Sequence, residues 1–323
     1  MVFDNSKTCI LVLAYGDRCS NLSVVLNAVR TERPKLLVIV ENEISDRSKL
    51  VVEEFMARGS LYTELVILPN NLGSAGGYAK GIKRALELPG WDTLWLLDDD
   101  NRPTDGSLHA LEEAFQSLCD PHVALLASRP DLPEMVALID GDAPPLPRLG
   151  SFIGFHIGNL FGNPITEGTL DDGLSMAPYG GLFISRELLS LIGLPNERYF
   201  LYCDDIEWTS RISKVGGKIM LARNAIVRDL DPVWNATGPT NSNLLRRIFY
   251  LDQAKAYYEI RNRLYTARTL FPGRRTVYRL NRFIYMSATA LICIMFGKMK
   301  RWRLISKAVR DAESGLLGRI EDL

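Results

Sequence analysis

The stretch Thr93-Leu94-Trp95-Leu96-Leu97, followed by Asp98-Asp99-Asp100, is the part of the sequence that decides the fold. Its apolar run predicts a buried strand, and the three carboxylates predict where that strand ends. Ligands of parallel sheets bind beyond the carboxyl ends of the strands. We therefore expect the aspartate triplet at the edge of a sheet where a ligand would bind.

Similar apolar runs separated by helical patterns surround this strand. We predict strands at residues 8–14, 35–40, 64–68 and 218–222, and helices at 21–30, 48–58 and 77–88. Continuous apolar strands that alternate with helices are typical of a parallel sheet covered on both faces. The handedness of the connections makes this an open, doubly wound α/β sheet. Residues 130–172, rich in Pro, Gly and Asp, predict a long irregular excursion near the site.

Composition narrows the class of protein. The five cysteines are scattered without a C-x-x-C pair, which indicates reduced thiols. The N-terminus has no basic stretch followed by an apolar run, so we expect no secretory signal and a cytoplasmic protein.

The aspartate triplet favours a metal site. Adjacent carboxylates repel one another and are costly to ionise together unless a cation is present. Oxygen ligands suit Mg²⁺ or Mn²⁺, which would neutralise a diphosphate. A solvated acidic turn is the alternative, and the position at a strand end favours the metal.

Two further motifs follow in the chain. The small residues of 70–77 lie between a strand and a helix, where backbone can approach an anion; this signal is weak, because such turns are common. Asp204, Asp205 and Glu207 lie at the start of a predicted helix, where the helix dipole would also explain each acid. A second acidic cluster, far in sequence from the first, is what a metal-plus-base mechanism requires.

Together these motifs resemble the family-2 glycosyltransferases with the GT-A fold, and most closely the galactofuranosyl- and rhamnosyltransferase branch. Seven motifs match in the order of the family, over about residues 8–262. They are Ala14-Tyr15 with Arg18, Glu41-Asn42 with Ser45 and Asp46, Asn71-x-Gly73-x-x-Gly76-Gly77, Asp98-Asp99-Asp100, Gly180 to Ser185, Asp204-Asp205-x-Glu207 with Arg211 and Gly216, and Tyr257-Tyr258-x-x-Arg261-Asn262. The resemblance implies a GT-A type, doubly wound, mainly parallel sheet in residues 1–240, and a basic helical region in residues 241–323.

The resemblance also implies roles for individual residues. The nucleoside would be held by Ala14, Tyr15, Arg18 and Glu41, and the diphosphate lined by Asn71, Gly76 and Gly77. Asp98 and Asp100 would bind the metal, and Asp99 would touch the ribose or the donor sugar. Asp205 would be the catalytic base, Asp204 would bind acceptor or sugar hydroxyls, and Trp208, with Glu207, would contact the acceptor.

One position departs from the family pattern. Close relatives usually carry a metal-binding His after the strand that follows the base helix, and here Asp229 stands there. Asp229 would be an oxygen ligand in its place, or the third protein ligand is lost.

The C-terminal region is strongly basic. Residues 244–310 contain 16 Lys and Arg and two acidic residues, a net charge of +14, although the whole chain is neutral. The apolar run 283–296 is too short for a span of about 20 residues. We expect a helix lying on an anionic membrane surface, because the family extends glycans on lipid carriers; a buried helix of a bundle is the alternative. No binding motif supports a nucleic-acid partner. Residues 276–286 and the helix after Lys298 are candidates for a contact between two copies.

The sequence thus predicts an inverting, metal-dependent enzyme that moves a hexose from a nucleotide diphosphate to a glycan or glycolipid hydroxyl. UDP-galactofuranose is the first expected donor and dTDP-rhamnose the second. The alternatives are a nucleotidyltransferase, which would carry a basic Gly-rich loop where Tyr15 to Cys19 stand, and a catalytically silent sugar-nucleotide or membrane-binding scaffold.

Overall fold

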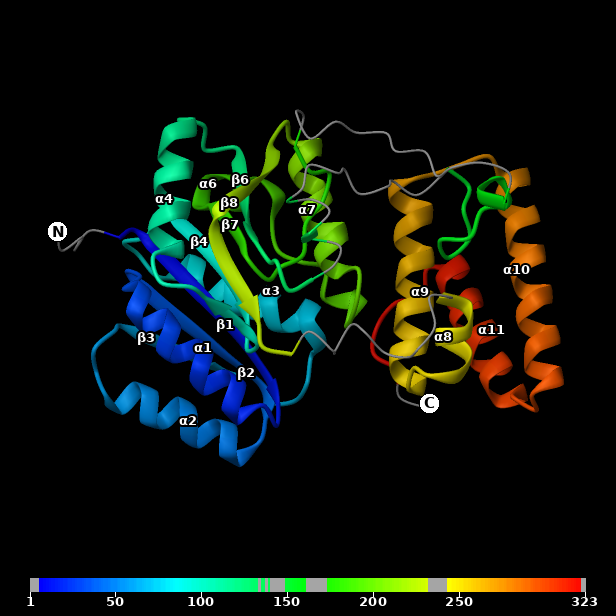
Figure 1. The fold of residues 1–323 in the computed structure, drawn as a ribbon, viewed down its shortest axis with the longest axis horizontal. Helices are drawn as coiled ribbons and strands as arrows, with labels where there is room; N and C mark the ends of the chain where they lie inside the picture. The colour runs from blue at the N-terminus through cyan, green and yellow to red at the C-terminus, as the bar shows by residue number, and fades with distance from the viewer. Residues whose placement is uncertain are drawn as a thin grey trace. The chain divides into compact units, whose positions relative to one another are not determined.

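A single sheet of eight strands organises the N-terminal two thirds of the chain (Figure 1). The computed structural model describes residues 6–132, 135, 136, 139, 149–160, 173–231 and 243–320. The strand order is β3-β2-β1-β4-β7-β6-β8-β5. The strands are β1 Thr8–Gly16, β2 Leu36–Ile44, β3 Thr63–Ile67, β4 Thr93–Asp98, β5 Asn101–Pro103, β6 Val123–Ser128, β7 Leu182–Ser185 and β8 Lys218–Asp229. The predicted α/β fold with C-terminal helices is confirmed.

The four strands predicted from apolar runs in the first hundred residues pair in parallel. β1 lies between β2 and β4, and β2 pairs with β3. The other half of the sheet is mixed, because β7 runs antiparallel to both β4 and β6. The parallel half therefore brings the carboxyl ends of β1, β2 and β4 to one edge.

Helices cover both faces of the sheet. One face packs against α1 Cys19–Glu32, α2 Asp46–Ala57 and α4 Ser107–Leu118, and the other against α3 Gly73–Glu87, α6 Arg186–Ile192 and α7 Asp204–Lys214. Side chains of β1 alternate between these layers: Ile10 and Val12 face the first, and Leu11 and Leu13 face the second. Burial on both faces is why β1 reads as a continuous apolar run.

Helix α3 begins at Gly73, four residues before the predicted start. The side chains of Asn42 and Asn71 make this possible, because they accept hydrogen bonds from Leu72 N (2.8 Å) and Gly73 N (2.7 Å). Amides at a helix start have no partner inside the helix, so these side chains stabilise the first turn.

Strand β8 is longer than predicted. It continues from Ala222 to Asp229 because it pairs first with β6 and then with β5, where Asn101 lies opposite Asp229. These cross-strand partners lie far away in the sequence, so the local pattern of β8 does not show where the strand ends. Most of the predicted excursion at residues 130–172 lies outside the described residues.

The chain divides into two compact units, and each is made of several segments. Unit 1 comprises Met1–Asp142, Thr169–Glu197 and Asp205–Pro232, and unit 2 comprises Ala143–Gly168, Arg198–Asp204 and Val233–Leu323. Unit 2 contains α8 Asn243–Phe249, α9 Gln253–Leu270, α10 Arg275–Met295 and α11 Met299–Ser314. Across the described ranges, no helix is both long enough and apolar enough to cross a membrane.

Candidate active site

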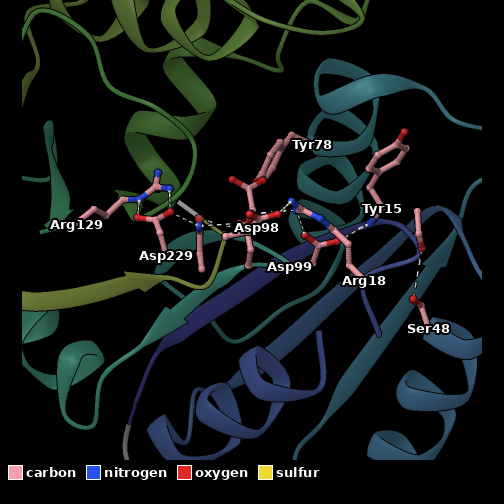
Figure 2. Close-up of polar contacts among 12 residues, drawn as sticks. Tyr15, Arg18, Ser48, Tyr78, Asp98, Asp99, Arg129 and Asp229 are labelled. Atoms are coloured by element: carbon pink, nitrogen blue, oxygen red, sulfur yellow. Dashed lines mark hydrogen bonds and ion pairs between the residues drawn. The ribbon is translucent and has the colours of Figure 1, made fainter. Parts of the chain in front are cut away.

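The aspartate triplet lies at the carboxyl edge of the sheet, where β4 ends beside β1 (Figure 2). The hydroxyl of Tyr78 donates to Asp98 Oδ1 at 2.7 Å. Asp99 accepts from the backbone amide of Tyr15 at 2.9 Å and from Arg18 at 2.8 Å. The Arg18 guanidinium also reaches Asp100 Oδ2 at 3.0 Å. Residues from β1, α3 and β4 therefore meet in one polar cluster, as the sequence predicted for this edge.

Burial raises the pKa of all three aspartates. The pKa rises from 3.8 to about 6 for Asp98, Asp99 and Asp100, chiefly because their carboxylates lose solvent. The charges of Asp98 and Asp229 raise the pKa of Asp100 further. The charges of Arg18 and Arg129 oppose the shift, so desolvation outweighs the attraction of the arginines at all three carboxylates.

A second arginine, which the sequence analysis did not identify, lies among these acids. Arg129 follows β6, and its Nε donates to Asp229 Oδ2 at 3.1 Å while Nη2 contacts Oδ1 of the same carboxylate. The two side chains are 9% and 6% exposed. Arg129 also lowers the pKa of Asp98 and of Asp205. Arg129 is therefore a buried cation that acts on Asp229, Asp98 and Asp205. Nothing local in the sequence distinguishes it from other arginines.

Asn101 contacts both Asp100 and Asp229, two of the residues predicted to bind the metal. Its side-chain amide donates to Asp100 Oδ1 at 3.0 Å and to Asp229 Oδ1 at 3.2 Å. Gly180 lies against the same group, because a Cβ there would meet Asn101 Oδ1 at 2.1 Å and Asp98 Oδ2 at 3.1 Å. Any side chain at position 180 would displace this cluster, which explains the glycine.

The fit of this site to a divalent cation is mixed. The described residues include no group of three or more His, Cys, Asp or Glu side chains arranged to hold a metal ion. Asp98 and Asp100 offer half-buried carboxylates of raised pKa, which a cation would stabilise in the ionised form. Asp229 is engaged by both the Nε and Nη2 nitrogens of buried Arg129. The two Asp100 oxygens also accept hydrogen bonds, from Asn101 and from Arg18, so a cation held by Asp98 and Asp100 would have to displace the Arg18 contact.

The residues expected around the nucleoside and the diphosphate lie at the ends of β1 and β2 and at the start of α3. Ala14 is buried and the Tyr15 side chain is 44% exposed, so its ring is available for stacking. Glu41 is buried, and the loss of solvent raises its pKa. The amide side chain of Asn71 caps Gly73.

The two glycines of this group are explained by packing. A Cβ on Gly76 would meet Leu72 Cβ at 2.5 Å, and one on Gly77 would meet Leu13 Cδ1 at 2.6 Å. Both are therefore needed for the close approach of α3 to its own N-terminal turn and to β1, whether or not a phosphate also binds there.

The second acidic cluster occupies the first turn of α7. Asp205 is half-buried, and its pKa rises from 3.8 to about 6 because its carboxylate is desolvated. Its charge also raises the pKa of Asp98, so the two acids belong to one electrostatic site. Asp204 is buried. The sequence placed these acids in one site, and the structure brings Asp205 within electrostatic reach of Asp98.

The other two residues predicted for the acceptor have structural partners. Glu207 forms a paired contact with Arg211, at 3.0 Å to Nε and 2.6 Å to Nη2. Trp208 is fully buried; its Nε1 donates to Gly193 O at 2.7 Å and its ring packs on Tyr179. The structure therefore places Trp208 in the core of unit 1 and not on an open wall.

The loop before α7 has an unusual backbone, which α9 holds in place. Phe200, Tyr202 and Cys203 all have positive φ (67°, 69° and 62°), a conformation that costs a non-glycine residue about 1–3 kcal/mol. The buried side-chain amide of Asn262 donates to the carbonyls of Tyr199, Leu201 and Tyr202 at 2.8, 2.6 and 3.2 Å. The Arg261-Asn262 motif thus fixes the segment that leads directly into Asp204 and Asp205.

Comparison with known proteins agrees with this architecture. No protein-family model matches the chain. The chain is 27% identical over 220 residues to galactofuranosyltransferase GlfT1 of Mycolicibacterium smegmatis, which covers 64% of this chain and 66% of that protein. It is 29% identical over 195 residues to the protein of the same name from Mycobacterium tuberculosis, covering 58% of each. The matches thus span less than two thirds of these relatives.

A solved structure shows the fold. The structure of GalNAc-T7 with UDP, GalNAc and Mn²⁺ superposes with a TM-score of 0.52 at 14% identity, over 89% of this chain and 55% of that one. This chain has the GT-A fold and resembles the family-2 glycosyltransferases. The resemblance that the seven motifs indicated is confirmed. The acidic cluster at the carboxyl edge of β1 and β4 thus lies in a domain of the GT-A fold.

Proposed function

We propose that this protein is an inverting, metal-dependent glycosyltransferase. The observation that carries the proposal is the convergence of Asp98, Asp99, Asp100 and Asp205, desolvated and electrostatically linked, at the ligand-binding edge of a GT-A sheet. The end of β4 positions Asp98, Asp99 and Asp100, and the first turn of α7 supplies Asp205. Buried acids of raised pKa at such an edge are typical of catalytic sites.

Asp205 is the proposed base. With a pKa of about 6, its carboxylate is mostly ionised at neutral pH and still accepts a proton readily. As the acceptor oxygen bonds to the anomeric carbon, its proton passes to Asp205, and the bond from that carbon to the diphosphate oxygen breaks. One displacement without a covalent enzyme intermediate inverts the anomeric configuration.

Asp98 and Asp100 are the proposed holders of Mg²⁺ or Mn²⁺. A bound divalent ion would supply electrostatic stabilisation of the departing diphosphate. Tyr78 orients the Asp98 carboxylate through its 2.7 Å hydrogen bond, and Asn101 orients Asp100. Arg18 holds Asp99 beside the Tyr15 backbone, where the nucleoside end of the donor is proposed to lie.

The proposed donor is UDP-galactofuranose, with dTDP-rhamnose as the second choice. The names of the two mycobacterial relatives support galactofuranose. We further propose a lipid-linked glycan of the bacterial cell surface as the acceptor. The basic helices of unit 2 would hold the protein at the inner face of the cell membrane, and self-association through them is part of this proposal.

The test is a thermal-shift titration followed by a transfer assay. UDP with Mn²⁺ or Mg²⁺ is expected to raise the melting temperature, and EDTA or Asp98→Ala to abolish the rise, because a ligand of the folded state stabilises it. Asp205→Asn should abolish transfer while keeping the UDP shift, and Asp105→Asn, an exposed control, should change neither. Near-normal transfer by Asp205→Asn would refute the base assignment.

A silent nucleotide-binding scaffold is the second candidate. Arg18 and Arg129 already pair with Asp99, Asp100 and Asp229, so the site is partly neutralised without a metal. In a scaffold, UDP would stabilise the protein equally with EDTA and with Mn²⁺, and no donor would be hydrolysed or transferred.

A further inference from the structure

Unit 2 contains a cavity of about 540 Å³ that is lined by arginines. Arg268, Arg275, Arg279 and Arg282 border it, together with Tyr278 and Glu313. The volume lies within the range of small-ligand pockets, roughly 300–1,000 Å³. None of these residues takes part in the proposed active site, so the cavity needs its own explanation.

The cavity carries uncompensated positive charge. Glu313 lies 2.8 Å from Arg282 Nε and accepts a hydrogen bond from the Tyr278 hydroxyl at 2.8 Å. Among the described residues that line the cavity, Glu313 is the one carboxylate, and these two contacts engage it. Arg268 lies over the Tyr278 ring at 5.6 Å. Within the ranges that the structure describes, no carboxylate pairs with Arg275 or Arg279. A surplus of guanidinium groups around a hollow is the arrangement that binds a phosphate.

Buried hydrogen bonds and close backbone packing hold one wall of the cavity in place. Asn281 is fully buried, donates to Gly150 O at 2.9 Å and accepts from Ile157 N at 3.0 Å. Gly273 approaches Gly150 so closely that a Cβ would lie 2.1 Å from Gly150 N. These contacts fix the segment around Gly150 against α10, which carries Arg275, Arg279 and Arg282, and against the connection between α9 and α10.

An apolar face of α10 adjoins the rim of this cavity. Leu280, Phe283, Leu291 and Ile294 recur at helical spacing and are each 48–68% exposed. Phe283 follows Arg279 by four residues, so the two side chains are neighbours on the helix surface. An anion-binding hollow beside an exposed apolar stripe is complementary to a molecule with a phosphate at one end and hydrocarbon at the other.

We propose that this cavity, the arginine pocket, binds the phosphate head group of a membrane lipid, with the apolar face of α10 in the acyl region. The inference rests on the membrane contact of the proposed function and deepens it by naming the ligand group. It does not depend on the transfer chemistry.

The test is co-sedimentation of the full chain with vesicles of three compositions. These are phosphatidylcholine, the same lipid with phosphatidylglycerol, and the same lipid with phosphatidic acid at matched surface charge. We expect the tightest binding to phosphatidic acid, whose terminal phosphate fits the pocket. Arg275→Gln/Arg279→Gln should weaken it about 10- to 30-fold. The matched control Arg263→Gln/Arg310→Gln, which removes the same charge outside the pocket, should weaken it less than about threefold.

Two further measurements separate the possible ligands. Inorganic pyrophosphate at constant ionic strength should compete with phosphatidic acid vesicles for the native chain. Phe283→Gln/Ile294→Gln should lose vesicle binding but keep pyrophosphate binding by calorimetry. A native chain that binds pyrophosphate but no vesicle would overturn the lipid assignment.

The remaining outcomes distinguish failure of the pocket from failure of the membrane contact. Equal loss in the arginine pair and its control would show that general charge is sufficient, and would refute the pocket. Failure of the native chain to bind any vesicle would refute the lipid assignment of the arginine pocket and the proposed membrane contact together, while the transfer assay would stand unaffected.

Discussion

Replacement of Arg129 by Met tests the organisation of the acidic site. The guanidinium lies in a buried ion pair with Asp229 and lowers the pKa of Asp98 and Asp205. Removing one partner of such a pair leaves a buried charge and costs about 3–5 kcal/mol. For a domain of 150–250 residues each kcal/mol lowers the melting temperature by about 2–4 °C. We therefore expect Arg129→Met to melt roughly 6–20 °C below the native chain.

A double variant shows whether the unpaired carboxylate is the cause. Arg129→Met/Asp229→Leu removes both charges, and buried pairs replaced by apolar side chains are often close to neutral. It should therefore recover most of the loss. Mn²⁺ should stabilise Arg129→Met more than the native chain, because a cation would replace the missing guanidinium. Urea unfolding and calorimetric melting measure both effects.

Two results would refute this reasoning. If Arg129→Met unfolds within about 1 kcal/mol of the native chain, Asp229 is not left as a buried charge. If the double variant is no more stable than Arg129→Met, the cost comes from lost packing of the arginine side chain and not from electrostatics.

Three other predictions follow from the same structure. Asn262→Ala should lower transfer while leaving UDP binding unchanged in calorimetry, because the carbonyls of Tyr199, Leu201 and Tyr202 lose the hydrogen bond from Asn262. Unchanged turnover would contradict the positioning role. Folding raises the pKa of Asp98 and of Asp100 from 3.8 to about 6. Between these values the folded state binds more protons than the unfolded chain, so the unfolding free energy should fall as pH rises from about 4 to 6. Asp98→Asn/Asp100→Asn should flatten that slope in urea titrations. Gly81→Ala should cost about 1–3 kcal/mol in urea unfolding, since its Cβ would meet Val40 Cγ2 at 2.6 Å and Leu11 Cδ1 at 2.7 Å, whereas Lys83→Ala on the same helix should be nearly neutral.

Much of the parallel half of the sheet was predictable, because each of its strands is buried on both faces. The apolar runs at the starts of β1, β2, β3 and β4 mark these strands within a few residues. β6 and β7 were not predicted, although both are buried and apolar. Their apolar runs are local signals of the same kind as those of β1 to β4. What the sequence does not show is their pairing, in which β7 runs antiparallel to β4 and β6.

Some residues of the candidate site were also predictable from local sequence pattern, and others were not. Asp98 to Asp100 and Asp205 were identifiable because acids that follow a strand or begin a helix form a local pattern. Arg129 and Asn101 gave no such signal. Arg129 is one of many arginines in the chain, and Asn101 gains its role from lying opposite Asp229 across the β5–β8 pair.

The sequence by itself determined the alternation of strands and helices, the edge at which the acids gather and the basic character of the C-terminal region. These properties depend on residue order and on side-chain chemistry within short windows. The tertiary structure decided that Arg129 neutralises Asp229, that Asn262 holds the loop leading to Asp205, and that four arginines surround one cavity in unit 2. Each of these depends on pairing between residues distant in the chain, which long-range packing sets and local pattern does not reveal.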